Sequence, residues 1–284
     1  MQLIAIDLDG TLLSEEGSIS LENRRVIREA QNRGRIVVIS SGRSLHDTQE
    51  LLKEAGLDCP IITGNGAVAF HSSEIIQNLY LPVHISEEMM DLAKKHHLYY
   101  EVYTNEGVYI EEGGREFLER EAREVFEAKG EPAPEEAASI INTQHEQRGL
   151  HYVRDYRRID YTDLQVYKIF VLSFDREKLS KLKKELSGRV DISVTTSGQQ
   201  KLEIGNPRSS KGNALKFIAN YFEVDSDDTV AIGDNLNDLS MFEVAGTSIA
   251  MENAEPQVKK AADHITRHHN QDGVAYGIRR WILA

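Results

Sequence analysis

The chain has 284 residues and a single cysteine, Cys59, so it cannot contain an intramolecular disulfide or a zinc site built from several cysteines. Long apolar runs are missing as well. Residues 169–172 form one of the longer runs, far below the ~18 residues that a membrane span needs. The first residues lack the basic stretch and apolar run of a signal peptide. We therefore expect a cytoplasmic protein with no membrane partner.

Basic residues are scarce relative to acidic ones. The 33 Lys and Arg residues against 46 Asp and Glu residues leave a formal net charge of −13. Broad binding to nucleic acid or anionic lipid needs a basic surface, so we expect neither partner. A chain of this length predicts two domains, at about 100–200 residues each.

The two ends of the chain alternate between short apolar runs and amphipathic stretches. Strands are predicted at 3–6, 36–39 and 61–63, with helices at 21–32 and 45–55 between them. Asn65-Gly66 predicts a hairpin into 67–70. The alternation resumes near Ser209 with a helix around Leu215, a strand at 229–232, a helix at about 236–245, a strand at 248–251 and two terminal helical stretches. Such alternation is typical of a parallel sheet covered by helices.

The middle of the chain has a different, α+β pattern. It predicts a helix at about 87–96, strands at 99–103 and 107–111, a solvated helix and loop at 111–137, a strand at 164–174, a helix at 177–186 and a strand at 191–196. We therefore predict an α/β fold. Its core is a Rossmann-like doubly wound parallel sheet, discontinuous in sequence (1–82 and 200–284), with an α+β domain inserted at 83–199.

Polar segments follow three of the predicted core strands. They are Asp7-Leu8-Asp9-Gly10-Thr11, Ser40-Ser41-Gly42-Arg43 and Gly233-Asp234-Asn235-Leu236-Asn237-Asp238. Open parallel sheets bind ligands at the carboxyl ends of their strands, so four carboxylates converge if these strands are neighbours. Crowded carboxylates repel each other, and a divalent cation removes the repulsion. Oxygen ligands without nearby His or Cys favour Mg²⁺, which proteins commonly share with substrate phosphate. The pattern therefore points to phosphoryl chemistry.

Lys211 adds a cation to this set. It lies in the first turn of a helix that Ser209 or Ser210 caps, where a cation opposes the helix dipole. A bound phosphate reverses the sign, because the ammonium group and the helix N-terminus both attract an anion.

Together, these motifs resemble the haloacid dehalogenase-like hydrolase superfamily, and within it the Cof-type phosphatases with a large α/β cap. The matching stretches are Asp7-x-Asp9-Gly10-Thr11-Leu12, Ser41 in Ile39-Ser40-Ser41-Gly42-Arg43, Lys211 in Ser210-Lys211-Gly212, Gly233-Asp234-x-x-Asn237-Asp238, Met251-x-Asn253-Ala254 and Asp272-Gly273-Val274-Ala275. Ser41 stands where relatives usually have Thr, and Glu252 where they commonly have Gly. The cap position, between the second and third motifs, is typical of the subgroup.

The resemblance implies a role for each matched residue. Asp7 would be the nucleophile that forms an aspartyl-phosphate, and Asp9 the general acid and base. Magnesium would be held by the Asp7 carboxylate, the Asp9 carbonyl and Asp234, with Asp238 orienting the site. The phosphoryl oxygens would be bound by Leu8 and Gly42 through their amides, and by Ser41, Lys211 and Asn237. The cap would close over the site and select the substrate.

Three functions remain open at this point. The first is a magnesium-dependent phosphatase of small phosphorylated metabolites, sugar phosphates above all. The second is a phosphomutase or phosphotransferase that uses the same aspartyl-phosphate. The third is a non-enzymatic phospho-receiver module that signals through Asp7, although such a module is about half this length and lacks the second acid and the cap. The role of Arg43, structural or substrate-binding, also stays open, as does the oligomeric state.

Overall fold

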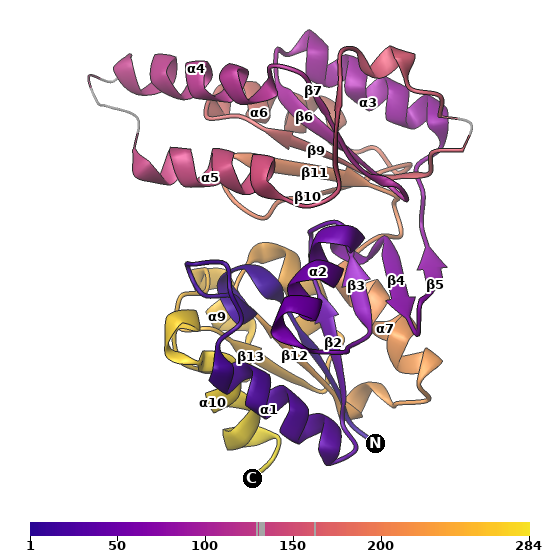
Figure 1. Cartoon of the computed structure of the whole chain (residues 1–284), viewed down its shortest axis with the longest axis vertical. Coiled ribbons are helices and arrows are strands. Elements are labelled where there is room, and N and C mark those ends of the chain that lie inside the picture. The colour runs from indigo at the N-terminus through magenta and orange to yellow at the C-terminus, as the bar shows by residue number, and fades with distance from the viewer. Residues whose placement is uncertain (129, 131–133, 162) are drawn as a thin grey trace. The chain divides into compact units, whose positions relative to one another are not determined.

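The structure is a computed structural model that describes residues 1–128, 130, 134–161 and 163–284 (Figure 1). It divides into two compact units. The discontinuous unit comprises Met1–Asn78 and Arg208–Ala284, and the inserted unit comprises Leu79–Pro207. Residues 79–82 and 200–207 thus lie in the inserted unit, outside the 83–199 expected from sequence. The reason at the second boundary is a strand, β11 (Lys201–Gly205), which pairs with a strand of the inserted sheet.

The discontinuous unit is built on an eight-stranded sheet with the order β14-β13-β12-β1-β2-β3-β4-β5. The strands are β1 (Leu3–Ile6), β2 (Ile36–Ser40), β3 (Ile61–Thr63), β4 (Val68–His71), β5 (Glu74–Asn78), β12 (Thr229–Gly233), β13 (Thr247–Ala250) and β14 (His264–Ile265). Pairing is parallel from β14 to β3, and β4 and β5 are antiparallel. This sheet confirms the predicted α/β fold class.

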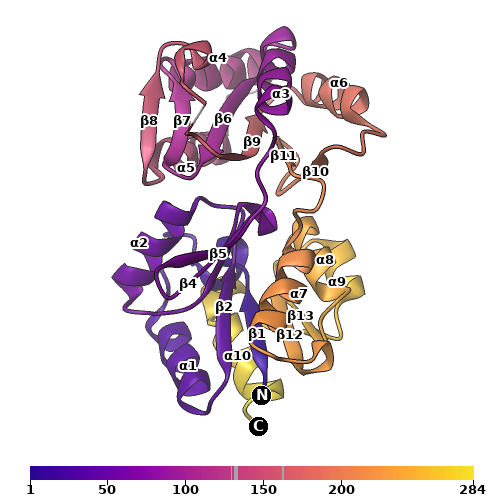
Figure 2. The ribbon, with the colours of Figure 1, turned by 90° about the vertical axis from the view of Figure 1, so that its right-hand side faces the viewer.

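Helices cover both faces of this sheet, with α1 and α2 on one side and α7 and α8 on the other (Figure 2). The helices are α1 (Leu21–Asn32), α2 (Leu45–Ala55), α7 (Lys211–Tyr221), α8 (Leu239–Phe242), α9 (Pro256–Ala261) and α10 (Gly273–Trp281). Local chemistry sets the ends of α2: the Ser44 hydroxyl accepts from the Asp47 N–H, and Gly56 ends the helix at φ 62°. The apolar stripe of α1 (Val26, Ile27, Ala30) is buried.

Two strands of this unit have no counterpart in the sequence prediction. β5 is largely exposed and pairs with β4 at the edge of the sheet, and β14 has two residues. Neither carries the apolar run on which the prediction depended. The predicted helix at 236–245 is also shorter than expected: a turn, Leu236–Asp238, precedes the four residues of α8.

The inserted unit has a six-stranded sheet with the order β10-β11-β9-β6-β7-β8. Its strands besides β11 are β6 (Tyr99–Thr104), β7 (Gly107–Glu111), β8 (Leu150–Val153), β9 (Val166–Leu172) and β10 (Ser193–Thr195). Two helices, α3 (Val83–Lys95) and α6 (Arg176–Leu186), contact this sheet and share its main apolar cluster, which includes Met89, Val102, Ile169 and Leu182. The opposite face carries buried polar side chains, among them Glu101, Lys168 and Glu203.

The charged segment after β7 forms two helices, α4 (Gly114–Glu127) and α5 (Glu135–Glu146), followed by β8. The sequence prediction had one helix here and did not include α5 or β8. Pro132, part of the predicted loop, lies outside the described residues. Within the described part of the chain, no helix combines the length and apolarity required to cross a bilayer.

Candidate active site

The strand order brings the predicted motifs to one edge of the parallel sheet. β1 lies between β12 and β2, with Ile6 in register with Ile232 and Ile39. The Asp7 N–H donates to the Ile232 carbonyl at 3.0 Å, so the segment after β1 begins beside the segment after β12. The carboxyl ends of these three strands are therefore neighbours, as the motif argument required.

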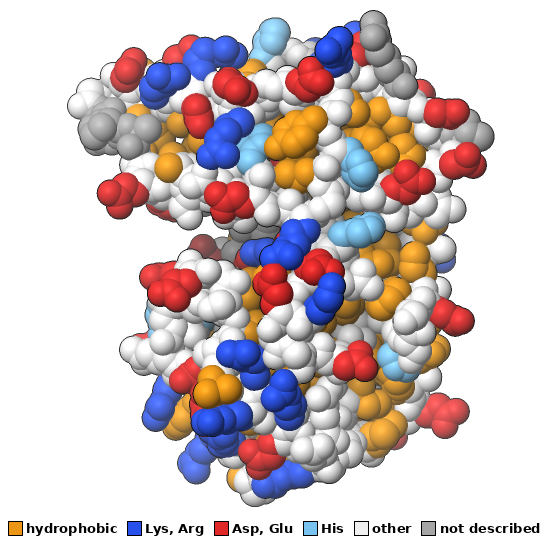
Figure 3. Space-filling model, in the orientation of Figure 1, with side chains coloured by type: hydrophobic (Ala, Val, Ile, Leu, Met, Phe, Trp, Pro, Cys, Tyr) orange, Lys and Arg blue, Asp and Glu red, His pale blue; other side chains and the backbone are white. Residues whose placement is uncertain are grey.

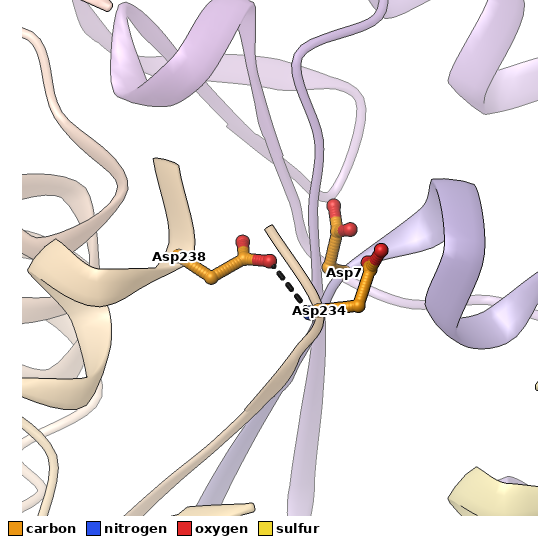
Figure 4. Close-up of side chains that lie close together, drawn as sticks. All are labelled: Asp7, Asp234 and Asp238. Carbon is orange, nitrogen blue, oxygen red and sulfur yellow. Dashed lines mark hydrogen bonds between the residues drawn. The ribbon is translucent and has the colours of Figure 1, made fainter. Parts of the chain in front are cut away.

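Three of the four predicted carboxylates gather there: Asp7, Asp234 and Asp238 each offer an oxygen within 4.8 Å of the others. Figure 4 shows the Asp7 and Asp234 carboxylates side by side, while the Asp238 carboxylate turns to the backbone of Asp234. Asp238 Oδ2 accepts from the N–H groups of Asp234 (2.9 Å) and Asn235 (3.0 Å). Asp7 and Asp238 are buried, and Asp234 is 9% exposed.

Lys211 connects two of these carboxylates. Its Nζ lies 2.6 Å from Asp7 Oδ1 and 2.6 Å from Asp238 Oδ1, and its side chain is fully buried. Ser210 is the cap of α7, since its hydroxyl accepts from the Asn213 N–H at 3.0 Å. A buried lysine between two carboxylates is well compensated, which explains why a cation is tolerated at this helix N-terminus.

The electrostatics show a surplus of negative charge. Burial, followed by repulsion from Asp238, raises the pKa of Asp7 well above its usual value, although Lys211 opposes the shift. The same two causes raise the pKa of Asp234 to about 7. Burial would lower the pKa of Lys211, but Asp238 and Asp7 together raise it. One lysine does not balance three buried carboxylates, and this group could hold a metal ion.

The turn after β1 is shaped to hold Asp234. The Thr11 hydroxyl donates to Asp234 Oδ1 at 2.8 Å. Gly10 has φ 73°, and a Cβ on it would lie 2.4 Å from Asp234 Oδ2. Asn253, in a stretch that the resemblance had singled out without a role, donates to the Gly10 carbonyl at 2.7 Å. Glu252 does not have a positive φ, so its backbone conformation does not require the glycine that relatives commonly have there.

Asp9, the fourth carboxylate, has a different environment. Its side chain is 57% exposed and bound by Arg43: Arg43 Nη2 lies 2.7 Å from Asp9 Oδ1, and Nε 2.9 Å from Oδ2. Arg43 Nη1 also binds Asp47 Oδ2 at 2.7 Å. Burial would lower the pKa of Arg43, but Asp9 and Asp47 raise it by more, so the pKa lies above its usual value. Arg43 thus holds Asp9. The sequence analysis left the role of Arg43 open and did not single out Asp47.

The remaining predicted site residues lie in the segments that meet at this edge. Leu8 follows Asp7 directly, and Ser41 and Gly42 follow β2. Ser41 is buried, and its hydroxyl accepts from the Arg43 N–H at 3.1 Å. Asn237 lies in the turn before Asp238, and its Nδ2 donates to Asn65 Oδ1 at 3.1 Å. Asn65 was predicted only as part of a hairpin turn. Its contact with Asn237, 172 positions away, has no local sequence signal.

Comparison with known proteins agrees with this geometry. A family model described as haloacid dehalogenase-like hydrolase matches residues 4–278. The chain belongs to the haloacid dehalogenase-like hydrolases. Within them it is a Cof-type phosphatase, a hydrolase of phosphomonoesters.

Two curated relatives and one solved structure match this haloacid dehalogenase-like hydrolase over nearly its whole length. Phosphatase YwpJ of Bacillus subtilis is 33% identical over 97% of this chain and 98% of its own. A second B. subtilis protein, 5-amino-6-(5-phospho-D-ribitylamino)uracil phosphatase YwtE, is 35% identical over 98% of this chain and 97% of its own. A solved haloacid dehalogenase-like hydrolase from B. subtilis is 32% identical, covers 99% of this chain and 100% of its own, and superimposes with a TM-score of 0.88.

Proposed function

We propose that this chain is a magnesium-dependent phosphatase of small sugar or polyol phosphates that works through an aspartyl-phosphate on Asp7. The observation that carries the proposal is the group of three buried carboxylates, two of which Lys211 bridges. It supplies a nucleophile, cation ligands and a phosphate-binding ammonium group within one site. Receiver modules lack the second acid, and Asp9 is present beside this group.

The residues fit a magnesium ion. Asp7 and Asp234 offer hard oxygen ligands, and no His or Cys belongs to the group. Burial and then repulsion from Asp238 raise the pKa of both carboxyls, and a bound cation would oppose both effects. The Asp7 and Asp234 carboxylates and the Asp9 carbonyl would hold the ion, which would neutralise charge on the phosphoryl oxygens. Asp238 accepts from Lys211 and two backbone N–H groups, so it would orient the site instead of binding the ion.

The chain's own residues perform the two proposed half-reactions. A carboxylate oxygen of Asp7 attacks phosphorus, the bond from phosphorus to the ester oxygen breaks, and Asp9 protonates the departing alcohol. Asp9 then takes a proton from water, the water oxygen attacks phosphorus, and the bond to Asp7 breaks to release inorganic phosphate. Lys211, Ser41, Asn237 and the amides of Leu8 and Gly42 would hold the phosphoryl oxygens throughout.

The proposed substrate class comes from a relative. YwtE bears the name of a phosphatase whose substrate carries a phosphorylated ribityl chain on a uracil ring. Sequence similarity over almost the whole of both chains makes a phosphorylated sugar or polyol the first class to test here. We further propose that the inserted unit serves as the cap that selects among such esters. Replacing 79–207 by a short linker should then keep p-nitrophenyl phosphate hydrolysis and flatten the ranking of natural esters.

Surface charge supports a small-molecule partner over nucleic acid. Figure 3 shows acidic and basic side chains intermixed on the face in view. Two arginines in and just after α1 are paired with glutamates, Arg25 with Glu22 and Arg33 with Glu29. Paired cations hold few phosphates of a polyanion.

The decisive test is phosphate release over a panel of sugar phosphates, ribitylaminouracil phosphate, nucleotides, flavin mononucleotide and pyridoxal phosphate. We expect activity with Mg²⁺ and a reversible loss of that activity on chelation. Ca²⁺ should replace Mg²⁺ poorly, because its coordination shell is larger and looser. Asp7→Asn should show no turnover. Asp58→Asn, an exposed residue outside the site, is the matched control. Quenched wild-type enzyme should carry phosphate on Asp7. Phosphate on another residue, or full activity after chelation, would refute the mechanism, and phosphate returned to a sugar instead of to water would make the enzyme a mutase.

A further inference from the structure

The turn after β3, Gly64–Gly66, touches three elements that carry proposed phosphate ligands. The Asn65 N–H donates to the Ser41 carbonyl at 3.1 Å. Asn65 Oδ1 accepts from Asn237 Nδ2 at 3.1 Å. Gly66, at φ 94°, lies against the residue that caps the Lys211 helix, since a Cβ on it would approach the Ser210 carbonyl oxygen to 2.1 Å. One short turn therefore packs against the segments of Ser41, Lys211 and Asn237.

Asn65 is unusual within this turn. Its backbone is left-handed, with φ 55° and ψ 38°, and the residue is 5% exposed. Asparagine tolerates this conformation better than most residues, and glycine tolerates it fully. A hairpin turn alone requires neither burial nor a side-chain contact to a distant motif. The amide of Asn65 is therefore present for more than the turn.

The amide of Asn237 depends on this contact. Asn237 Oδ1 is buried and has no hydrogen-bond partner among the described residues. An asparagine amide has two N–H donors and one acceptor, and turning it over exchanges them. The oxygen of Asn65 takes one N–H and thereby leaves the second N–H for a ligand. Without the Asn65 oxygen, the Asn237 amide is free to turn its own carbonyl oxygen toward a bound phosphate, and the phosphate would repel that carbonyl oxygen.

We propose that Asn65 is a positioning residue of the phosphate site, which acts by fixing the orientation of the Asn237 amide. The expected consequence for phosphate binding rests on the proposed function. The contact between the two side chains stands apart from that function. It assigns to Asn65 a role that neither the motifs nor the comparisons identify.

Asn65→Gly is the informative variant, because glycine keeps the left-handed backbone and removes only the amide. We expect the competitive inhibition constant of inorganic phosphate to rise about tenfold, the usual scale of one hydrogen bond, with a matching rise in KM and little change in kcat. Ser73→Gly is the control, since Ser73 also has a positive φ (66°), is exposed, and lies in the β4–β5 hairpin. A residue important only for the turn would lower the thermal midpoint without moving the phosphate constant.

A double variant shows whether Asn65 acts through Asn237. Asn65→Gly combined with Asn237→Ala should bind phosphate no more weakly than Asn237→Ala alone, because the positioned group is already gone. Multiplied losses in the double variant, or a phosphate constant in Asn65→Gly equal to that of Ser73→Gly, would overturn the proposal.

Hydrogen exchange of the Asn237 side-chain amide, measured by NMR, keeps this test separate from the proposed function. One of its two protons should be protected in the wild type and in Asn65→Asp, which retains the acceptor, and should exchange at least about tenfold faster in Asn65→Gly. Equal protection in Asn65→Gly would overturn the inference even if the enzyme is a phosphatase. A wild type without phosphatase activity but with this exchange pattern would instead refute the proposed function alone. If Asn65→Gly does not fold, loss of the protected proton in folded Asn65→Asp overturns the inference.

Discussion

The guanidinium group of Arg43 binds Asp9 on both carboxylate oxygens, at 2.7 Å to Oδ1 and 2.9 Å to Oδ2, and joins it to Asp47. Two nitrogens of one arginine on the two carboxylate oxygens fix the orientation of that carboxylate. In the proposed first half-reaction, Asp9 donates a proton to the departing alcohol. Arg43 thus sets the direction of the group that is proposed to carry this proton.

Asp9→Asn should separate the acid role from the nucleophile. The variant keeps the backbone carbonyl of residue 9 and keeps Asp7, but it loses the proton donor and the base. We expect the rate of hydrolysis of sugar phosphates to fall by ~10²–10⁴-fold. p-Nitrophenolate leaves without a proton, so the first step should suffer less with p-nitrophenyl phosphate. Rapid-quench kinetics should then show a burst of up to one equivalent followed by slow turnover. Equal losses on both substrates without a burst would assign the acid–base role to another residue.

Arg43→Met should distinguish positioning of Asp9 from substrate binding. Methionine keeps most of the side-chain volume and removes the charge, so Asp9 loses its fixed orientation. We expect kcat to fall by up to about 10²-fold with KM nearly unchanged, since misplacement of a catalytic group acts on the chemical step. Arg28→Met, which alters an exposed arginine bound to the Gly56 carbonyl, is the control. A raised KM at constant kcat would show that Arg43 contacts the substrate.

Gly10→Ala tests the close approach of the turn to Asp234. Alanine is strained at φ 73°, and its Cβ would collide with the Asp234 carboxylate. We expect a lower free energy of unfolding, by about 1–3 kcal/mol, and a weaker apparent Mg²⁺ affinity. Gly17→Ala is closely matched, because Gly17 has φ 72° and nothing within 4 Å of a Cβ. If both variants bind Mg²⁺ equally well, the collision at Asp234 does not matter.

Glu101 should make the inserted unit sensitive to pH. This buried carboxyl accepts from the Tyr99 hydroxyl (2.8 Å) and Gln147 Nε2 (2.9 Å), and burial raises its pKa to about 7. Between its unfolded value of 4.5 and about 7, the folded state binds more protons than the unfolded state, so stability falls as pH rises and levels off above 7. At low pH, the raised pKa of Glu101 contributes on the order of 3 kcal/mol to the free energy of unfolding.

Glu101→Gln should remove that slope, because an amide does not titrate. Thermal unfolding from pH 4.5 to 8 would show it as a wild-type midpoint that declines more steeply than the midpoint of the variant. Glu136→Gln, at an exposed residue of α5, should keep the wild-type slope. Parallel curves for wild type and Glu101→Gln would mean that Glu101 is ionised throughout this range.

Local patterns were enough to predict much of this protein. The apolar runs of β1, β2 and β12 and the amphipathic α1 and α2 lie where sequence placed them, because each depends on neighbouring residues alone. The residues that follow β1 and β12 converge because parallel strands end at the same edge of the sheet. Alternation along the chain, read with the motif spacing, thus determined the fold class and brought Asp7 and Asp234 together.

Tertiary structure alone decided the contacts among distant segments. Strand β11 joined the inserted sheet through its partner β9, and the weakly apolar strands β5 and β14 were recruited by edge pairing. The pairing of Asp9 with Arg43 and of Asn65 with Asn237 depends on how loops from different strands turn toward one another. Such contacts have no period in the sequence, because loop direction follows from backbone geometry and packing and not from the side-chain pattern of one segment.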